Sequence, residues 1–226
     1  RPLLRLFSSL SNNHNNDKLS ILPISSTTTQ TSAMAAKDAK PEVRKIYEQI
    51  KWPVILYVIL AAGYVASIPG KWIWFSWHPL TMIVSFIGLA INGAMIKKIG
   101  GYDNTVTHGK LMNAGVAIAL FGWYVIYSNK EMNNKPHLVT LHAKLGVVAM
   151  LGYLGLGVVG LLALHPDFGF LKTNQTVRFA HKWSGRAMTA LAWYVCVLGF
   201  AKMQPELWKQ LLFGVPLLAA GFIVLL

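Results

Sequence analysis

The 226-residue sequence has little negative charge and very little charge of any kind. Eight Asp and Glu stand against 21 Lys and Arg, and charged residues make up 13% of the chain whereas 54% is hydrophobic. A typical soluble domain is about 25% charged, so this composition excludes an ordinary soluble protein and predicts an integral membrane protein. The basic excess would suit nucleic acid in a soluble chain. Beside so much apolar sequence it indicates membrane-flanking loops, and we expect no nucleic-acid partner.

Cysteine is almost absent, with Cys196 as the single example. One thiol cannot form an internal disulfide, a Cys-based zinc site, an iron–sulfur site or a C-x-x-C-H haem attachment. Any metal or cofactor must therefore be held by other side chains, and the seven histidines are the obvious supply. Acidic residues are also missing from the long apolar runs, which disfavours an ion-coupled transporter or a channel.

Residues 1–45 differ in composition from the rest of the chain, being rich in Ser, Thr and Asn. We assign them to a disordered N-terminal tail, and residues 46–226 to one transmembrane domain. Arg1, Arg5, the Ser-rich continuation and the shortage of acids are typical of an organelle transit peptide, which predicts a mitochondrial or plastid membrane. The alternatives are a plain disordered tail or a true start at Met34, with another endomembrane as the location.

Six apolar runs follow, each close to the ~20 residues that cross a ~30 Å hydrocarbon layer. They cover Pro53–Ile68, Trp72–Ile96, His108–Tyr127, Leu138–Leu164, Phe179–Met203 and Leu207–Leu226. At this length only helices satisfy their backbone polar groups inside lipid, so the sequence predicts an all-α membrane protein, a six-helix transmembrane bundle. The loops on the side where the first span begins, here the near face, hold ten basic residues, and those on the opposite, far face hold six. This excess places the near face on the cytosol-like or matrix-like side.

Four histidines occur at the starts of four consecutive spans, and ionisable side chains there are a default functional hypothesis because they are costly in lipid. They are His78 in SWHPLTM, His108 in THGKLMN, His142 in LHAKLG and His181 in AHKWSG. Because consecutive spans run in opposite directions, His78 and His142 belong to the far face, and His108 and His181 to the near face. The spacing therefore sorts the four side chains into two pairs.

Small residues below the histidines favour a large flat ligand. Gly146 lies one turn beyond His142, and Gly185 one turn beyond His181, where a missing side chain leaves room for a macrocycle edge. Two imidazoles facing each other across a helical bundle are typical of six-coordinate haem. The sequence thus supports two haems, each held by two histidines of the central four helices. Copper or zinc is a poorer alternative, because two histidines without a carboxylate or thiolate make a weak site.

Two other histidines are rivals for these roles. His137 precedes His142 by five residues, which on a helix is ~140° around the axis, so both cannot face one site. His165 lies at the near end of the fourth span and is the weaker rival for the near pair.

From about Trp52 to Leu226 the sequence resembles the cytochrome b561 family of transmembrane ferric reductases and ascorbate-dependent electron carriers. The resemblance rests on the WHP, HG, LH and H-x-x-x-G histidines and their order. It implies iron ligation by His78 with His142 and by His108 with His181. It also implies two non-covalent b-type haems and frequent homodimers. Electrons are expected to pass from ascorbate on the cytosolic side to monodehydroascorbate or ferric iron on the other. One departure is TLHAK, with Lys144, where the family commonly has an SLHSW-like stretch.

Basic residues on the near face supply a candidate donor site. Lys97 and Lys98 end the second span, Lys110 follows His108, and Arg186 lies just beyond His181, so they could gather an anionic reductant. The alternative is that they only anchor the topology. A second hypothesis for the whole chain is a haem-binding or structural membrane subunit of an organellar electron-transfer complex without turnover of its own.

Overall fold

The computed structural model describes residues 40–225. Most of the tail assigned to residues 1–45 lies outside this range. The transit-peptide hypothesis concerns those residues, so it stays a prediction. Within it the chain is helical and forms no strand. The elements are α2 Pro41–Ser67, the 3₁₀ turn η1 Trp74–Ser76, α3 Trp77–Ile83, the π-helix η2 Val84–Leu89, α4 Ala90–Ile99, α5 Tyr102–Met132, α6 Leu141–Val158, the π-helix η3 Val159–Ala163, α7 Gln175–Met203 and α8 Leu207–Val224.

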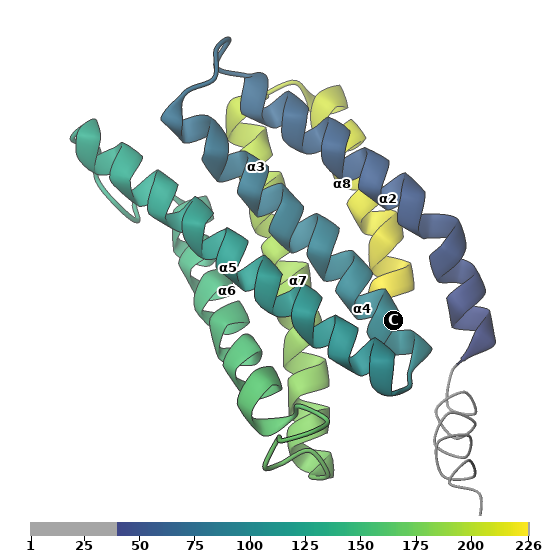
Figure 1. Ribbon diagram of the computed structural model, residues 1–226. Coiled ribbons are helices and arrows are strands. Elements are labelled where there is room, and N and C mark those ends of the chain that lie inside the picture. The colour runs from purple at the N-terminus through teal and green to yellow at the C-terminus, as the bar shows by residue number, and fades with distance from the viewer. Residues whose placement is uncertain (1–39, 226) are drawn as a thin grey trace, which may run out of the picture. The chain divides into compact units, whose positions relative to one another are not determined.

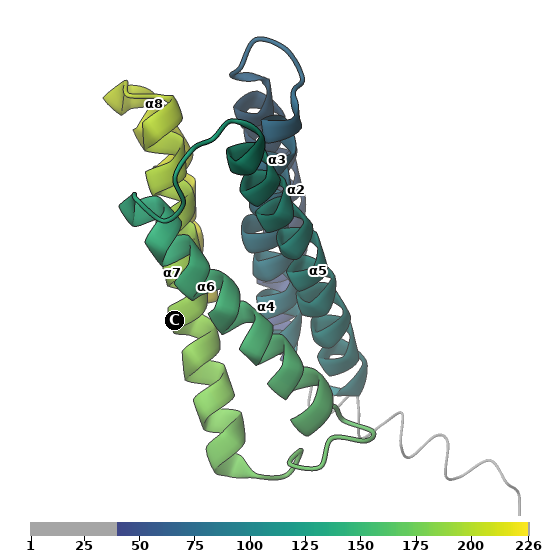
Figure 2. The same cartoon turned by 90° about the vertical axis from the view of Figure 1, so that its left-hand side faces the viewer.

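These elements form membrane-spanning helices that alternate in direction (Figures 1 and 2). Five are long and apolar enough to cross a bilayer: α2, the continuous unit Trp74–Ile99, α5, the unit Leu141–Ala163, and α8. The sixth, α7, is 29 residues long and carries basic residues in its first half. The prediction of an all-α membrane bundle is confirmed, and the chain is an integral multi-pass membrane protein.

Several helices begin earlier than the apolar runs do. α2 begins at Pro41 and continues through Pro53, because Tyr47 and its apolar neighbours pack on the bundle and the Tyr47 hydroxyl donates to the Asn92 side chain at 3.2 Å. α5 begins at Tyr102, so His108 lies in its second turn and not at its start. Hydropathy marks where a helix enters lipid, whereas polar residues outside that layer can extend it, which is why the predicted boundaries were short.

Four spans surround the centre of the bundle: the second (Trp74–Ile99), α5, the fourth (Leu141–Ala163) and α7. Their shared core is a buried cluster that includes Phe86, Val116, Ala149, Tyr153 and Ala192. A second cluster joins α2 and α8 to the outer sides of the second span and α7. α2 and α8 thus pack on the outside of the bundle. The four central spans, which carry the paired histidines, face one another.

Buried hydrogen bonds tie these central helices together. The Trp193 indole N–H donates to the carbonyl of Phe86 at 2.7 Å, and the Ser85 hydroxyl donates to the carbonyl of Gly115 at 2.6 Å. The hydroxyls of Tyr153 and Thr189 are 2.8 Å apart. In hydrocarbon no water competes for these groups, so each bond helps to fix how neighbouring helices meet.

Replacing Trp193 with Phe should therefore destabilise the bundle, because it leaves the Phe86 carbonyl without its donor and opens a gap in the core. We expect a loss of about 1 kcal/mol for the bond alone, measured as a lowered thermal midpoint in detergent. Trp208→Phe is the matched control, since Trp208 is 63% exposed. Equal shifts for both variants would contradict a structural role for the Trp193 bond.

Candidate functional site

A cavity of about 500 Å³ lies between α3, α5, α6 and α7 toward the far face. Its lining includes the buried side chains of Phe86 and Met150, and its walls are mostly apolar side chains of the four central spans. Thr140, Lys130 and Lys202 lie at its far end. This volume is within the range of roughly 300–1,000 Å³ that cofactors and drug-sized ligands occupy.

His78 and His142 face each other across this cavity. Their ring centroids are 6.3 Å apart and the ring planes are inclined by 83°. Two imidazoles bonded to opposite sides of one metal through bonds of ~2 Å have centroids roughly 6 Å apart, so the spacing fits two axial ligands of one iron. Thr140 caps the helix that positions His142, since its side chain accepts from the Ala143 N–H at 3.2 Å.

Both rings are oriented by the backbone of a facing helix. His78 Nδ1 lies 2.9 Å from the carbonyl oxygen of Gly122 in α5, and His142 Nδ1 lies 3.0 Å from that of Val195 in α7. A carbonyl oxygen can only accept, so each Nδ1 carries the proton and leaves the lone pair of Nε2 for a metal. Such a contact fixes the tautomer and the ring orientation of metal-bound histidines.

The near pair is assembled less completely. His108 Nδ1 lies 2.9 Å from the carbonyl oxygen of Gly93, whereas His181 Nδ1 is buried and has no hydrogen-bond partner among the described residues. Lys97 is close enough to interact electrostatically with both rings. Within the described range, however, no ring contact joins His108 to His181. The structure thus brings His78 and His142 together as a formed pair and places His108 and His181 in one region without ring contact.

Glycines on facing helices make room for these rings, and the sequence did not single them out. A Cβ on Gly199 would lie 2.8 Å from His142 Cε1, and one on Gly160 would lie 3.4 Å from His181 Cε1. Gly122 and Gly93 supply the carbonyls that face His78 and His108. The sequence signal that could have identified these positions was a glycine inside an apolar span. Which glycine faces which histidine ring depends on helix packing, which the sequence does not show.

The two glycines that were chosen from the sequence have different surroundings. Gly146 lines the far cavity, and a Cβ there would make an ordinary contact of 3.7 Å with Val195. A Cβ on Gly185 would meet nothing within 4 Å, and the Gly185 carbonyl accepts from the Thr189 hydroxyl at 2.8 Å. Space therefore exists beside both, although neither is in close contact with its histidine.

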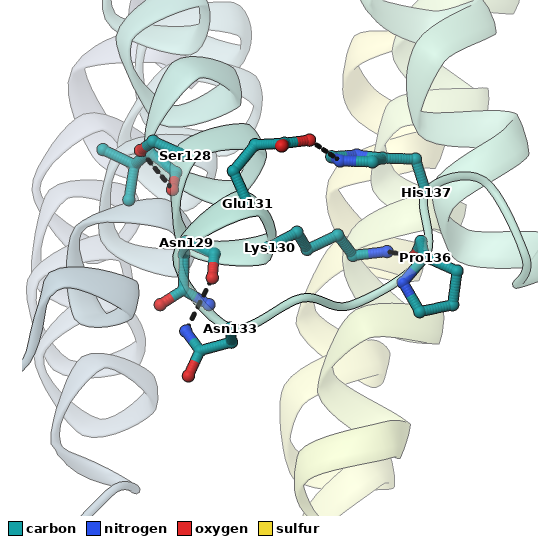
Figure 3. A network of polar contacts seen from close by, with 8 residues as sticks. Ser128, Asn129, Lys130, Glu131, Asn133, Pro136 and His137 are labelled. Atoms are coloured by element: carbon teal, nitrogen blue, oxygen red, sulfur yellow. Dashed lines mark hydrogen bonds and ion pairs between the residues drawn. The ribbon is translucent and has the colours of Figure 1, made fainter.

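The rival histidines have other contacts. His137 lies at the rim of the far cavity, where its ring stacks on Tyr127 at 4.9 Å between centroids and its Nε2 is 2.7 Å from Glu131 Oε1 (Figure 3). His165 stacks on Phe168 at 4.0 Å in the loop before α7. Neither ring faces one of the four paired histidines.

The basic residues of the near face are partly engaged already. Lys97 Nζ donates to the Thr105 hydroxyl at 2.7 Å, and Lys98 Nζ donates to the carbonyl of Ile223 at 2.7 Å. The Arg186 guanidinium lies 4.8 Å from the centre of the Trp183 ring and within electrostatic range of Lys98. Lys110 is exposed on α5. The structure therefore brings Lys98 and Arg186 into one positive region.

The donor set fits haem better than a bare metal ion. Among the described residues, no three His, Cys, Asp or Glu side chains gather where they could hold a metal. Two opposed imidazoles are enough only if a macrocycle supplies the remaining ligands, and the space between α3 and α6 is lined mostly by apolar groups. The far site therefore fits a non-covalent haem.

Comparisons with known proteins agree with this geometry. The family model described as eukaryotic cytochrome b561 matches residues 77–205, a segment that contains all four paired histidines. The chain is also similar to the human transmembrane reductase CYB561D2, with 26% identity over 154 residues, which are 55% of this chain and 69% of the relative.

Replacing Gly199 with Ala should disturb the far site selectively. The added methyl would have to displace the His142 ring, so we expect at least a twofold fall in far-site haem with the near-site spectrum kept. Gly155→Ala is the matched control, because a Cβ there meets nothing within 4 Å. Haem content and reduced-minus-oxidised spectra of both purified variants measure the effect. An unchanged haem content in Gly199→Ala would refute the close-packing requirement.

Proposed function

The chain belongs to the eukaryotic cytochrome b561 family, and on that basis we propose that it carries single electrons across a membrane through two b-type haems. The observation that carries this proposal is the facing pair of His78 and His142, with both Nδ1 atoms held by backbone carbonyls. When bound, each haem supplies an iron that takes up and releases one electron.

The side chains of the protein would hold the haems, and its backbone carbonyls orient the histidine rings. His78 and His142 would hold the haem at the far site, and His108 and His181 the haem at the near site. At His78, His108 and His142 the carbonyl contact keeps the proton on Nδ1 and fixes the ring, so Nε2 would be free to bind iron. The apolar walls of the far cavity exclude water and keep a haem in a low dielectric.

The direction of transfer is proposed from charge and family. Lys97, Lys98, Lys110 and Arg186 lie on or beside the near face, where they would concentrate an anionic donor such as ascorbate. The far face would then deliver electrons to monodehydroascorbate or ferric iron. The human relative is named a transmembrane reductase, which favours this activity over a structural subunit without turnover.

Two further parts of the proposal concern the surroundings of the protein. The lipid bilayer is its medium, since the spans expose many large apolar side chains. An organelle membrane is proposed from residues 1–45, and a homodimer from the family resemblance.

Purified protein should contain two extractable haems per chain. His78→Ala or His142→Ala should remove one spectral component, and His108→Ala or His181→Ala the other, because the pairs belong to opposite faces. Pyridine haemochrome assays and redox difference spectra give both quantities. A haem-to-protein ratio near zero would end the electron-carrier proposal, and loss of the same component from His78→Ala and His108→Ala would refute the pairing.

Reduction by ascorbate should depend on the near-face cations. Neutralising Lys97, Lys98 or Lys110 should slow reduction severalfold at low salt and leave the haem spectrum unchanged, and added salt should slow the unmodified protein in the same way. Stopped-flow reduction across a salt series measures this. Lys71→Met, on the opposite face, is the control. If the reduction rate changed neither with salt nor with these substitutions, the basic residues would serve only to anchor the orientation of the protein in the membrane.

A further inference from the structure

The far cavity has an unusual distribution of charge. Among the described residues that line it there is no Asp, Glu or Arg, and the charged side chains are Lys130 and Lys202. Lys130 is in the last turn of α5 and Lys202 in the last turn of α7. Both helices end at the far face, so two separate walls of the cavity each bring one ammonium group to its far end.

Neither lysine forms an ion pair with a carboxylate among residues 40–225. Lys130 Nζ donates to the carbonyl of Pro136 at 2.8 Å, while the adjacent carboxylate of Glu131 turns to His137 (Figure 3). Lys202 has no hydrogen bond or ion pair among the described residues. Lys130 is half-buried and Lys202 is exposed at the far end of the cavity, so both ammonium groups can approach an anionic ligand there without first breaking an ion pair among the described residues.

The helix ends at the far face add to the positive electrostatic potential of the two lysines. The N-termini of the unit Trp74–Ile99, which carries His78, and of α6, which carries His142, have partial positive charge. The C-termini of α5 and α7 would repel an anion, but a lysine in each last turn reverses the sign there. Complementing the helix dipole would by itself explain a lysine on each helix. It does not explain why both line the cavity while Lys135, on the same face, does not.

The cavity thus combines a mostly apolar interior of about 500 Å³, two opposed imidazoles and two cations on separate walls at one end. A haem has two propionate carboxylates on one edge of an apolar macrocycle. Resting on the function proposed above, we infer that Lys130 and Lys202 bind the propionates of the far-site haem and so set its orientation, with the acidic edge toward the far face.

The test compares haem with its dimethyl ester, which lacks the two negative charges. Apoprotein of the full-length chain is reconstituted with either pigment in a His108→Ala background, so that the signal reports the far site alone. The variants are Lys130→Met, Lys202→Met and the double substitution, and Lys135→Met is the matched control. The rate of pigment transfer to excess apomyoglobin is measured, and circular dichroism checks the fold.

With both lysines present, we expect the ester to leave about tenfold faster than haem, because two charge-assisted contacts are lost. In the double variant the two pigments should leave at equal rates, and Lys135→Met should behave like the unsubstituted chain. Lys202→Met should lose part of the discrimination without touching the Lys130–Pro136 contact.

Discrimination that persists in the double variant, or that is absent when both lysines are present, would overturn the inference. So would a double variant that keeps haem normally and changes only the rate of oxidation by ferricyanide, since the lysines would then serve an anionic acceptor. Failure of the unmodified protein to bind any haem would instead refute the proposed function itself.

Discussion

The contact on which the centre of this bundle depends is a histidine ring held by the backbone carbonyl of a neighbouring helix. It occurs at His78, His108 and His142, with N–O distances of 2.9 to 3.0 Å. A ring can reach a main-chain oxygen inside a helix only if the side chains around that oxygen are small. Gly122 and Gly93 supply two of these oxygens, and at the third, that of Val195, Gly199 lies one turn further along α7 and leaves room for the His142 ring. The space for a flat ligand is what remains between helices fixed in this way.

The sequence was sufficient for the features that depend on one helix at a time. Apolar run lengths predicted the spans, and the alternation of their directions sorted the four histidines onto two faces, of which only His78 and His142 lie in ring contact among the described residues. The sequence was insufficient for contacts that depend on how two helices pack against each other. Gly199 is important because it faces His142, and nothing in its own neighbourhood in the sequence indicates that. The predicted first residues of some helices were also wrong, because hydropathy does not mark where a helix begins outside the lipid. α5, for example, begins six residues before His108, in polar sequence.

The two π-helices explain a further limit on reading helix faces from spacing. η2 at Val84–Leu89 and η3 at Val159–Ala163 interrupt the second and fourth spans. A π-turn changes the angular position of every residue that follows it, so a count of 3.6 residues per turn from His78 does not locate the face that Gly93 occupies. Gly93 follows the π-helix in the second span, and its carbonyl lies 2.9 Å from His108 Nδ1.

The carbonyl contacts have a bearing on how the protein is made. His78 contacts Gly122 and His108 contacts Gly93, both between the second and third spans, while His142 contacts Val195 between the fourth and fifth. Each contact therefore belongs to a hairpin of two consecutive spans. During synthesis, a hairpin can orient its histidines as soon as both of its spans have entered the bilayer, before later spans are translated. The pairing of His78 with His142 crosses from one hairpin to the other, so it is the step that must wait until two preformed halves meet.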